Sequence, residues 1–170
     1  MVIVLMGVSG AGKTTVGRLL AQALDAEFAE GDAYHPPENV EKMRRGIPLE
    51  DADRWPWLQI LAEQIARWLA AGKTVVLACS ALKQRYREVL AKGRPDVRFV
   101  HLEGDKALIR LRLDRRHGHY MPAALLDSQF AALEPPADAI TVDVTGTPEA
   151  ITAMIIRMLD MTSRPPAAPG

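Results

Sequence analysis

The stretch that decides the fold reads Val2-Ile3-Val4-Leu5-Met6-Gly7-Val8-Ser9-Gly10-Ala11-Gly12-Lys13-Thr14. Its first five residues are continuously apolar, which is typical of a strand buried on both faces of a parallel sheet. The last eight match the pattern G-x-x-x-x-G-K-[ST], and a helical pattern follows over residues 14–24. A glycine turn that matched by chance would lack this order of strand, loop and helix. The stretch therefore predicts an α/β domain with a phosphate-binding loop.

The chemistry of this loop indicates which groups would hold a nucleotide. Glycines let the backbone curl so that successive N–H groups point at an anion, and the helix that follows adds the positive end of its dipole. Lys13 is a predicted catalytic residue that would reach the β- and γ-phosphates, and the Thr14 hydroxyl would bind Mg²⁺. ATP and Mg²⁺ are therefore the expected cofactors. The predicted ATP contacts in this region are Gly7, Val8, Ser9, Gly10, Ala11, Gly12, Lys13, Thr14 and Thr15.

Strand and helix patterns alternate along the rest of the chain. This predicts a three-layer α/β domain of the P-loop NTPase type, with a parallel sheet flanked by helices. Further strands are expected at 26–29, 74–78, 97–102 and 139–144, and further helices at 36–45, 53–71, 84–91, 106–116, 122–133 and 148–159. We expect a single domain over residues 1–162, a mobile lid around 112–124, and a disordered Pro- and Ala-rich tail over 163–170.

Composition and charge argue against several kinds of partner. Basic and acidic side chains number 21 each, so the formal net charge is zero, and non-specific nucleic-acid binding, which needs a basic surplus, is not expected. The single cysteine, Cys79, allows no internal disulfide, and neither a secretion signal nor a membrane-spanning stretch is found. We therefore expect a cytoplasmic protein with no membrane partner.

An acidic pair, Glu30 and Asp32, follows the strand expected at 26–29. It would lie at the carboxyl edge of the sheet, where ligands bind in open α/β sheets. Asp32 would orient an acceptor hydroxyl as a catalytic residue, and Glu30 would help to hold the water shell of Mg²⁺; the alternative is a solvated turn. Arg54 would grip a carboxylate of the acceptor with its guanidinium, or would pair with its neighbours Asp51 and Asp53.

Basic side chains also follow the strand expected at 74–78 and the helix expected at 106–116. Lys83 and Arg87, four residues apart, would either contact an anion or form a basic turn on a surface helix. Cys79 is interpreted as a small buried residue, because phosphoryl transfer needs no thiol. In the lid, Arg116 is a predicted catalytic residue that would stabilise phosphate charge, whereas Arg110 and Arg115 fit a solvated face.

Four sequence blocks resemble the small P-loop gluconokinases, which are relatives of shikimate and nucleoside monophosphate kinases. The family pattern G-D-x-x-H-P-x-x-N-x-x-K-M-x-x-G-x-P-L-x-D-x-D-R-x-x-W-L is matched over 31–58. The others are C-S-A-L-K-x-x-Y-R over 79–87, R-x-x-x-R-x-G-H-[FY] over 112–120 and S-Q-F-x-x-L-E-x-P over 128–136. These blocks span nearly the whole chain in order, so the resemblance is far more specific than a phosphate loop alone.

The resemblance implies transfer of the γ-phosphoryl group of ATP to the 6-hydroxyl of D-gluconate, giving 6-phosphogluconate and ADP. It implies that Asp32 faces this hydroxyl, and that the candidate contacts to the acceptor are His35, Arg54, Lys83, Arg87 and Gln129. A kinase for shikimate or for another sugar acid is the nearest competing hypothesis, because pocket residues set specificity. A nucleotide-binding regulator without turnover is a competing hypothesis of another class.

The resemblance also has implications for ATP binding and for the oligomeric state. It implies that Arg112 and Arg116 form a pair of lid arginines, and that the loop containing Thr147 and Pro148 borders the adenine. Thr147 and Pro148 also fit a plain helix start, with a capping threonine followed by proline at the first position. The family further implies a homodimer.

Overall fold

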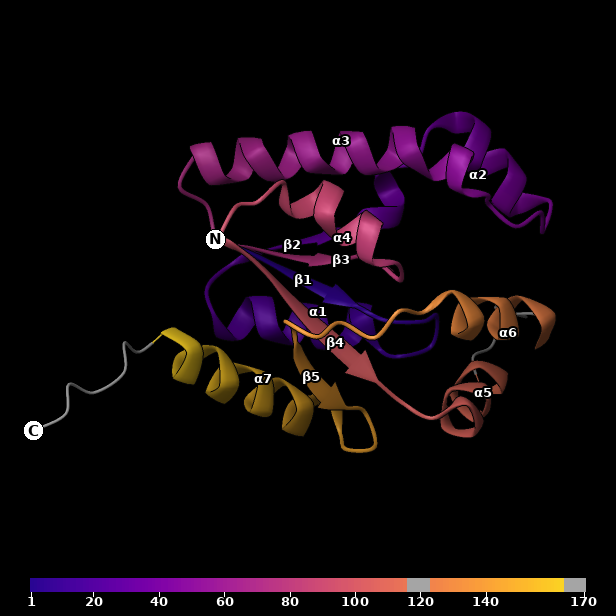
Figure 1. Ribbon diagram of the computed structural model, residues 1–170. Coiled ribbons are helices and arrows are strands. Elements are labelled where there is room, and N and C mark those ends of the chain that lie inside the picture. The colour runs from indigo at the N-terminus through magenta and orange to yellow at the C-terminus, as the bar shows by residue number, and fades with distance from the viewer. Residues whose placement is uncertain (116–122, 164–170) are drawn as a thin grey trace, which may run out of the picture.

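Five parallel strands form the centre of the structure, a computed structural model that describes residues 1–115 and 123–163 (Figure 1). They are β1 (Val2–Met6), β2 (Glu27–Glu30), β3 (Val75–Ala78), β4 (Val97–Glu103) and β5 (Ile140–Asp143), in the spatial order β2-β3-β1-β4-β5. All residues of β1 are buried, because this strand lies in the middle of the sheet and is covered on both faces. The predicted parallel α/β sheet is confirmed.

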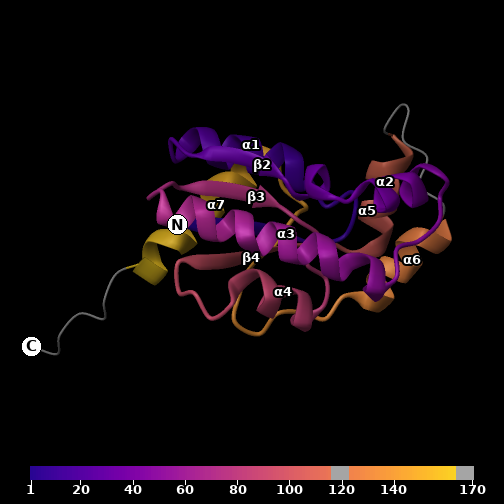
Figure 2. The ribbon, with the colours of Figure 1, turned by 90° about the horizontal axis from the view of Figure 1, so that it is seen from above.

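Helices cover both faces of the sheet (Figures 1 and 2). Ile3 and Leu5 of β1 pack in the same core as α1 and α7, whereas Val4 and Met6 pack in the core formed with α3. Successive side chains of a strand point to opposite faces, so one apolar strand contributes to two cores. The helices are α1 (Lys13–Ala23), α2 (Pro37–Arg44), α3 (Asp51–Ala70), α4 (Gln84–Ala91), α5 (Lys106–Asp114), α6 (Ala123–Ala132) and α7 (Pro148–Ser163).

The phosphate loop leaves the sheet between two helices that pack on opposite faces. β1 and β3 are neighbours, but α1, which follows β1, and α4, which follows β3, belong to different cores. Such a topological switch point forms a crevice at the carboxyl ends of the strands, where ligands bind in open α/β sheets. The segments that follow β1, β2 and β3 therefore meet at this edge.

The predicted elements are present, with shifted ends. α3 begins at Asp51, two residues earlier than predicted, because the Asp53 carboxylate accepts a hydrogen bond from the N–H of Glu50 at 2.9 Å and caps the helix from its first turn. A short 3₁₀ helix, η1 (Gly31–Tyr34), forms where the sequence indicated only a turn. The predicted lid falls partly, and the predicted tail almost wholly, outside the described residues.

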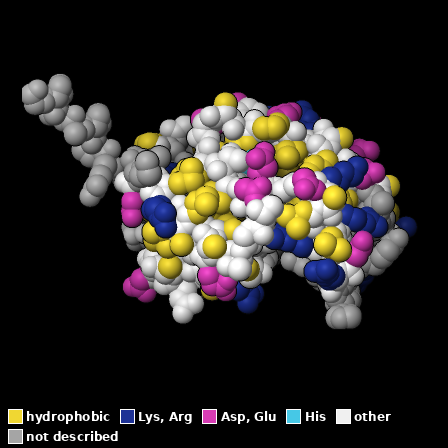
Figure 3. All heavy atoms as spheres, turned by 90° about the horizontal axis from the view of Figure 1, so that it is seen from below, with side chains coloured by type: hydrophobic (Ala, Val, Ile, Leu, Met, Phe, Trp, Pro, Cys, Tyr) yellow, Lys and Arg dark blue, Asp and Glu magenta, His cyan; other side chains and the backbone are white. Residues whose placement is uncertain are grey.

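One face of the molecule carries charges of both signs. On the face shown in Figure 3, acidic side chains lie among the Lys and Arg side chains, in keeping with the zero net charge of the chain. Within residues 1–115 and 123–163, no helix is both long enough and apolar enough to cross a bilayer.

Candidate active site

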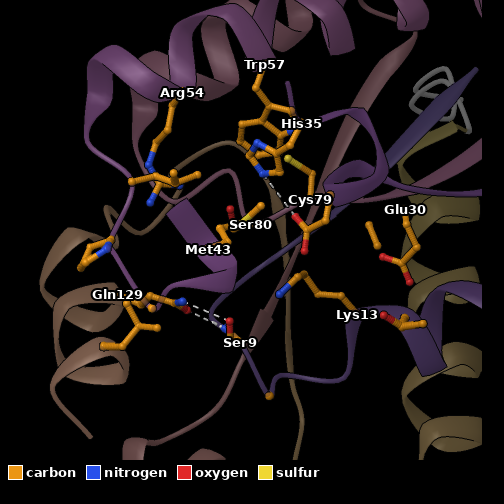
Figure 4. A pocket seen from close by; sticks show the side chains of 18 of the residues that line it. Ser9, Lys13, Glu30, His35, Met43, Arg54, Trp57, Cys79, Ser80 and Gln129 are labelled. Carbon is orange, nitrogen blue, oxygen red and sulfur yellow. Dashed lines mark hydrogen bonds and ion pairs between the residues drawn. The ribbon is translucent and has the colours of Figure 1, made fainter. Parts of the chain in front are cut away.

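A cavity of about 460 Å³ opens at the carboxyl edge of the sheet (Figure 4). The phosphate loop, the segments after β2 and β3, the α2–α3 segment and α6 all contribute to its lining. Many of the predicted site residues line it, namely Ser9, Gly10, Gly12, Lys13, Thr14, Glu30, Asp32, His35, Arg54 and Gln129. The structure therefore brings the predicted donor and acceptor residues into one cavity.

The phosphate loop has a backbone conformation that favours glycine. Gly10 and Gly12 have φ angles of 85° and 97°, in the left-handed region. A Cβ atom at Gly7 would lie 2.8 Å from the carbonyl oxygen of Leu102, so the loop approaches β4 too closely for a side chain. Lys13 begins α1, and its Nζ donates to the carbonyls of Gly7 and the following residue at 3.0 and 2.9 Å. These bonds hold the ammonium group over the loop.

η1 carries Asp32 to the cavity, and two contacts hold η1 in place. A Cβ atom at Gly31 would lie 2.7 Å from the carbonyl oxygen of Ala78, so only glycine lets η1 pass this close to β3. The indole Nε1 of Trp57 donates to the Gly31 carbonyl at 2.8 Å, and Trp57 is buried, which shields this hydrogen bond from water. The Asp32 side chain remains 79% exposed in the lining of the cavity.

His35 lies beside Asp32 but is almost completely buried. Its ring stacks on Trp57 with centroids 4.2 Å apart, and its Nε2 lies 3.8 Å from Oδ1 of Asp32 (Figure 4). Burial lowers the pKa of His35; the Asp32 carboxylate opposes this shift, and the Arg54 guanidinium adds to it. Burial therefore favours the neutral form of the His35 ring.

Lys83 lies outside the cavity lining, because Asp51 holds it. The Lys83 Nζ lies 3.0 Å from Oδ1 of Asp51, and the same carboxylate accepts hydrogen bonds from Arg85 and Tyr86. This cluster ties the start of α3 to α4. The predicted contact between Lys83 and the acceptor is not formed by this arrangement, because the lysine charge is already paired within the protein.

Arg54 lines the cavity (Figure 4). The neighbouring Asp53 accepts from Lys42 Nζ at 2.7 Å, and this bond, together with the one from the Glu50 N–H, lowers the pKa of Asp53. Within residues 1–115 and 123–163 no carboxylate forms an ion pair with Arg54, whose guanidinium lies 5.9 Å from the centre of the Tyr86 ring. The alternative in which Arg54 pairs with its acidic neighbours is wrong, and its guanidinium is available to an anion.

Arg87 is buried under the loop that follows β3 and does not line the cavity. Its Nη1 donates to the carbonyls of Ala81 and Leu82 at 3.0 and 3.1 Å, and its Nε and Nη2 donate to the side chain of Gln84. Ala81 has a φ of 43°, which is costly for a residue with a side chain, so the guanidinium stabilises a strained turn. Arg87 therefore has a structural role in place of the predicted acceptor contact. Neither anion binding nor a solvated helix face describes it.

Gln129 connects α6 to the phosphate loop. Its Oε1 accepts from the N–H of Ser9 at 2.7 Å, and its Nε2 donates to Ser9 Oγ at 3.0 Å (Figure 4). A side chain from far along the sequence thus occupies one of the N–H groups of the loop. Gln129, a predicted acceptor contact, lines the cavity, and the hydrogen bonds that it forms in this structure are with the phosphate loop.

The residues predicted to border the adenine surround the loop after β5. Arg112 donates through Nη2 to the carbonyl of Val144, and Thr147 Oγ1 accepts from the N–H of Ala150 at 3.2 Å. Thr147 therefore caps α7, which Pro148 begins, and the interpretation as a helix start is confirmed. The described lining of the cavity includes none of Arg112, Thr147 and Pro148. Arg116 lies outside the described residues.

Sequence reasoning missed an apolar wall of the cavity. It consists of Met43, Ile47, Pro48, Leu49 and Trp57. Most of it comes from the segment between α2 and α3, which matches neither the helical nor the strand period. Met43 and Ile47 are each 40% exposed, and large apolar side chains left open in a cavity are typical of a ligand site.

Comparisons with known proteins agree with this geometry. Residues 2–136 match the AAA domain family. Over 158 residues the chain is 48% identical to a gluconokinase of Gluconobacter oxydans (strain 621H), an alignment that covers 91% of this chain and 89% of that protein. The chain belongs to the gluconokinases. The resemblance found in the sequence is confirmed.

Two solved structures share the fold over nearly the whole chain. A sugar kinase from Janibacter sp. HTCC2649 has a TM-score of 0.86 at 48% identity and covers 94% of both chains. A gluconokinase from Sinorhizobium meliloti 1021 has a TM-score of 0.81 at 42% identity and covers 95% of this chain and 97% of that one. In the present structure, the gluconokinase block over 31–58 forms η1, α2 and the start of α3, which surround the acceptor side of the cavity.

Proposed function

We propose that this protein transfers the γ-phosphoryl group of ATP to the 6-hydroxyl of D-gluconate, giving 6-phosphogluconate and ADP. The observation that carries the proposal is that Arg54 and an exposed Asp32 lie in one cavity with the phosphate loop, and that no carboxylate of the described residues pairs with Arg54. A guanidinium binds a carboxylate through two parallel hydrogen bonds, and an ionised carboxylate accepts from a hydroxyl. A sugar acid carries both of the matching groups. The names of the relatives, which are gluconokinases, favour D-gluconate among the sugar acids.

On the donor side, the loop from Gly7 to Thr15 and the ammonium of Lys13 would bind the phosphates of ATP, and the N–H of Ser9 would first have to leave Gln129. Arg112 and the loop with Thr147 and Pro148 would border the adenine. Arg112 already bonds to the backbone of that loop, which supports a shared role.

Thr14 and Glu30 fit a magnesium ion. Both line the cavity, so one hydroxyl and one carboxylate are available to the ion and its waters. In the described part of the chain, no group of three or more His, Cys, Asp and Glu side chains is arranged to hold a metal, which suits an ion ligated mainly by phosphate oxygens and water. When bound, Mg²⁺ would neutralise part of the phosphate charge.

On the acceptor side, Asp32 would orient the reacting hydroxyl and accept its proton during transfer. Arg54 would hold the carboxylate of the acceptor, and the two contacts together would fix the acceptor relative to the phosphate loop. Lys13 would stabilise the charge of the transferring group. Catalysis then consists mainly of positioning and electrostatic stabilisation, as phosphoryl transfer requires.

A coupled assay of ADP release tests the function. At a fixed ATP concentration we expect release with D-gluconate and no release above background with shikimate or nucleoside monophosphates. Turnover with shikimate alone would support the competing kinase. If no acid increased ADP release above background while ATP binding was measurable, the result would support a nucleotide-binding regulator and overturn the proposal.

We also propose that the protein is a cytoplasmic homodimer. The family resemblance supports the dimer, and the lone Cys79, which is buried and reduced, is compatible with a reducing compartment. Light scattering of the purified protein should give twice the chain mass of 18.6 kDa. A mass of one chain at micromolar concentration would exclude the dimer.

A further inference from the structure

Asn39 connects α2 to α3 and to His35, the residue that follows η1. It lies on α2 and is buried, and its side-chain Nδ2 lies 2.8 Å from the carbonyl oxygen of Asp53 and 3.2 Å from Nδ1 of His35. None of the roles proposed above uses this residue. Its two contacts, taken together, determine which ring nitrogen of His35 carries the proton.

The argument starts from the Asp53 carbonyl. A carbonyl oxygen can only accept a hydrogen bond, so the Asn39 group that faces it must be the amide nitrogen and not the amide oxygen. That nitrogen carries two hydrogens. One is donated to the carbonyl, and the other points at His35 Nδ1, which must therefore accept. A neutral imidazole has one protonated nitrogen, so the proton of His35 is on Nε2.

We infer that Asn39 fixes His35 as the Nε2–H tautomer, and that His35 is thereby a hydrogen-bond donor that positions the Asp32 carboxylate. Nε2 lies 3.8 Å from Oδ1 of Asp32, and a modest rotation of this exposed carboxylate closes the gap to hydrogen-bonding distance. Because Nδ1 accepts from Asn39 and Nε2 is protonated, His35 has no free lone pair to take a proton from an acceptor. It is a positioning residue, and Asp32 remains the proton acceptor.

The surroundings of His35 keep the ring neutral and oriented. Trp57 of α3 covers one face of the ring and is itself held by its hydrogen bond to Gly31. The charged groups that face His35 are Asp32 from η1 and Arg54 from α3, and burial outweighs the attraction of the carboxylate. A neutral ring with one fixed proton can donate in one direction only, which is toward Asp32.

Nitrogen-15 NMR of the uniformly labelled full chain tests the tautomer directly, because protonated and unprotonated imidazole nitrogens have well-separated shifts. The chain has four histidines, so His35 is assigned by the loss of its signals in His35→Gln. At pH 7 we expect a protonated Nε2 and an unprotonated Nδ1. Asn39→Leu removes the donor to Nδ1 at similar size and should shift the signals toward a tautomer mixture, with the buried His101 as an unaffected internal control.

Either of two NMR results overturns the inference. One is a His35 protonated on Nδ1 or on both nitrogens in the unmodified protein, and this measurement stands even if Asn39→Leu does not fold. The other is a folded Asn39→Leu protein in which the His35 signals are unchanged. Neither readout depends on the acceptor, so a failure here is distinguishable from a failure of the proposed function.

The positioning role, which rests on the proposed function, is tested by turnover. His35→Phe keeps a ring against Trp57 but removes the donor, whereas His35→Gln keeps an N–H donor. A hydrogen bond to a charged group is lost in the first variant, so its kcat with D-gluconate should fall about ten- to a hundredfold while KM for ATP changes little. His35→Gln should recover much of this loss. An unchanged kcat in His35→Phe, or an equal loss in both variants, would overturn the positioning role.

Discussion

Replacing Arg54 by Met should raise the KM for D-gluconate and leave kcat largely unchanged. The guanidinium has no carboxylate partner among the described residues, because Lys83 is paired with Asp51 and Lys42 with Asp53. The substitution therefore removes a charge that the folded protein does not use in an ion pair. Its loss should act on the bound acceptor more than on the free enzyme.

The magnitude follows from the contacts that Arg54 can make. Two charge-assisted hydrogen bonds to a carboxylate contribute about 1.5–3 kcal/mol each. Arg54 is partly exposed, so solvent screening reduces the total to about 2–4 kcal/mol, which corresponds to a loss of about 30- to 1000-fold in kcat/KM. Stability should fall by only about 0.5–1 kcal/mol, because the contact with the Tyr86 ring is lost.

The assay measures coupled ADP release at saturating ATP over a range of D-gluconate concentrations. The KM of Arg54→Lys for D-gluconate should lie between those of the unmodified protein and Arg54→Met, because lysine keeps the charge but lacks the planar guanidinium. Arg67→Met is the matched control, since Arg67 lies in the last turn of the same helix and its pair with Glu63 is exposed. Arg54→Met should also raise the pKa of His35 in an NMR titration, because a positive charge that lowers it is gone. A folded Arg54→Met enzyme with a KM for gluconate within about twofold of the parent would refute the reasoning.

Other substitutions and conditions test the structural account. Arg87→Met leaves the carbonyl of Ala81 without a donor, while the carbonyl of Leu82 keeps its hydrogen bond from the N–H of Glu134. The unfolding free energy in urea should therefore fall by about 1–3 kcal/mol with little change in KM for gluconate; the reverse result would restore Arg87 as an acceptor contact. Gly31→Ala places a Cβ atom against β3 and displaces η1, which carries Asp32, so kcat should fall about a hundredfold. Gly146→Ala is the control: its Cβ atom would meet only ordinary van der Waals contacts, so kcat should change little. Burial lowers the pKa of His101, so the unfolded chain binds a proton that the folded protein excludes, and the unfolding free energy should decrease as pH falls below 6.5; His101→Gln should flatten this slope between pH 7.5 and 5.5. Burial raises the pKa of Cys79 to about 12, so thiol reagents at pH 8 should leave it unmodified until the protein is denatured; rapid labelling of native protein would contradict this.

Local patterns were sufficient for the elements and for the backbone conformation of the phosphate loop. The apolar run of β1, the glycines of the phosphate loop and Lys13 lie within fourteen consecutive residues, and the chemistry of the loop is a property of its own backbone. The strand and helix periods along the chain likewise predicted the parallel sheet, because burial on both faces requires continuous apolar strands. The differences are the ends of elements, where a cap such as Asp53 acts from inside the helix, and the short helix η1.

The tertiary structure decided which charged residues are available to a substrate. The sequence predicted acceptor contacts equally for three basic residues, Arg54, Lys83 and Arg87. In the structure, Arg54 lines the cavity, Lys83 is paired with Asp51, and Arg87 is buried against backbone carbonyls. Local sequence spacing could not predict the hydrogen bonds between Gln129 and Ser9 either, because the two residues are far apart in the chain. The spacing of apolar residues in the sequence predicts which face of a helix or strand is buried. The pairing of polar groups depends on competition among all the donors and acceptors that folding brings together, and only the folded chain resolves that competition.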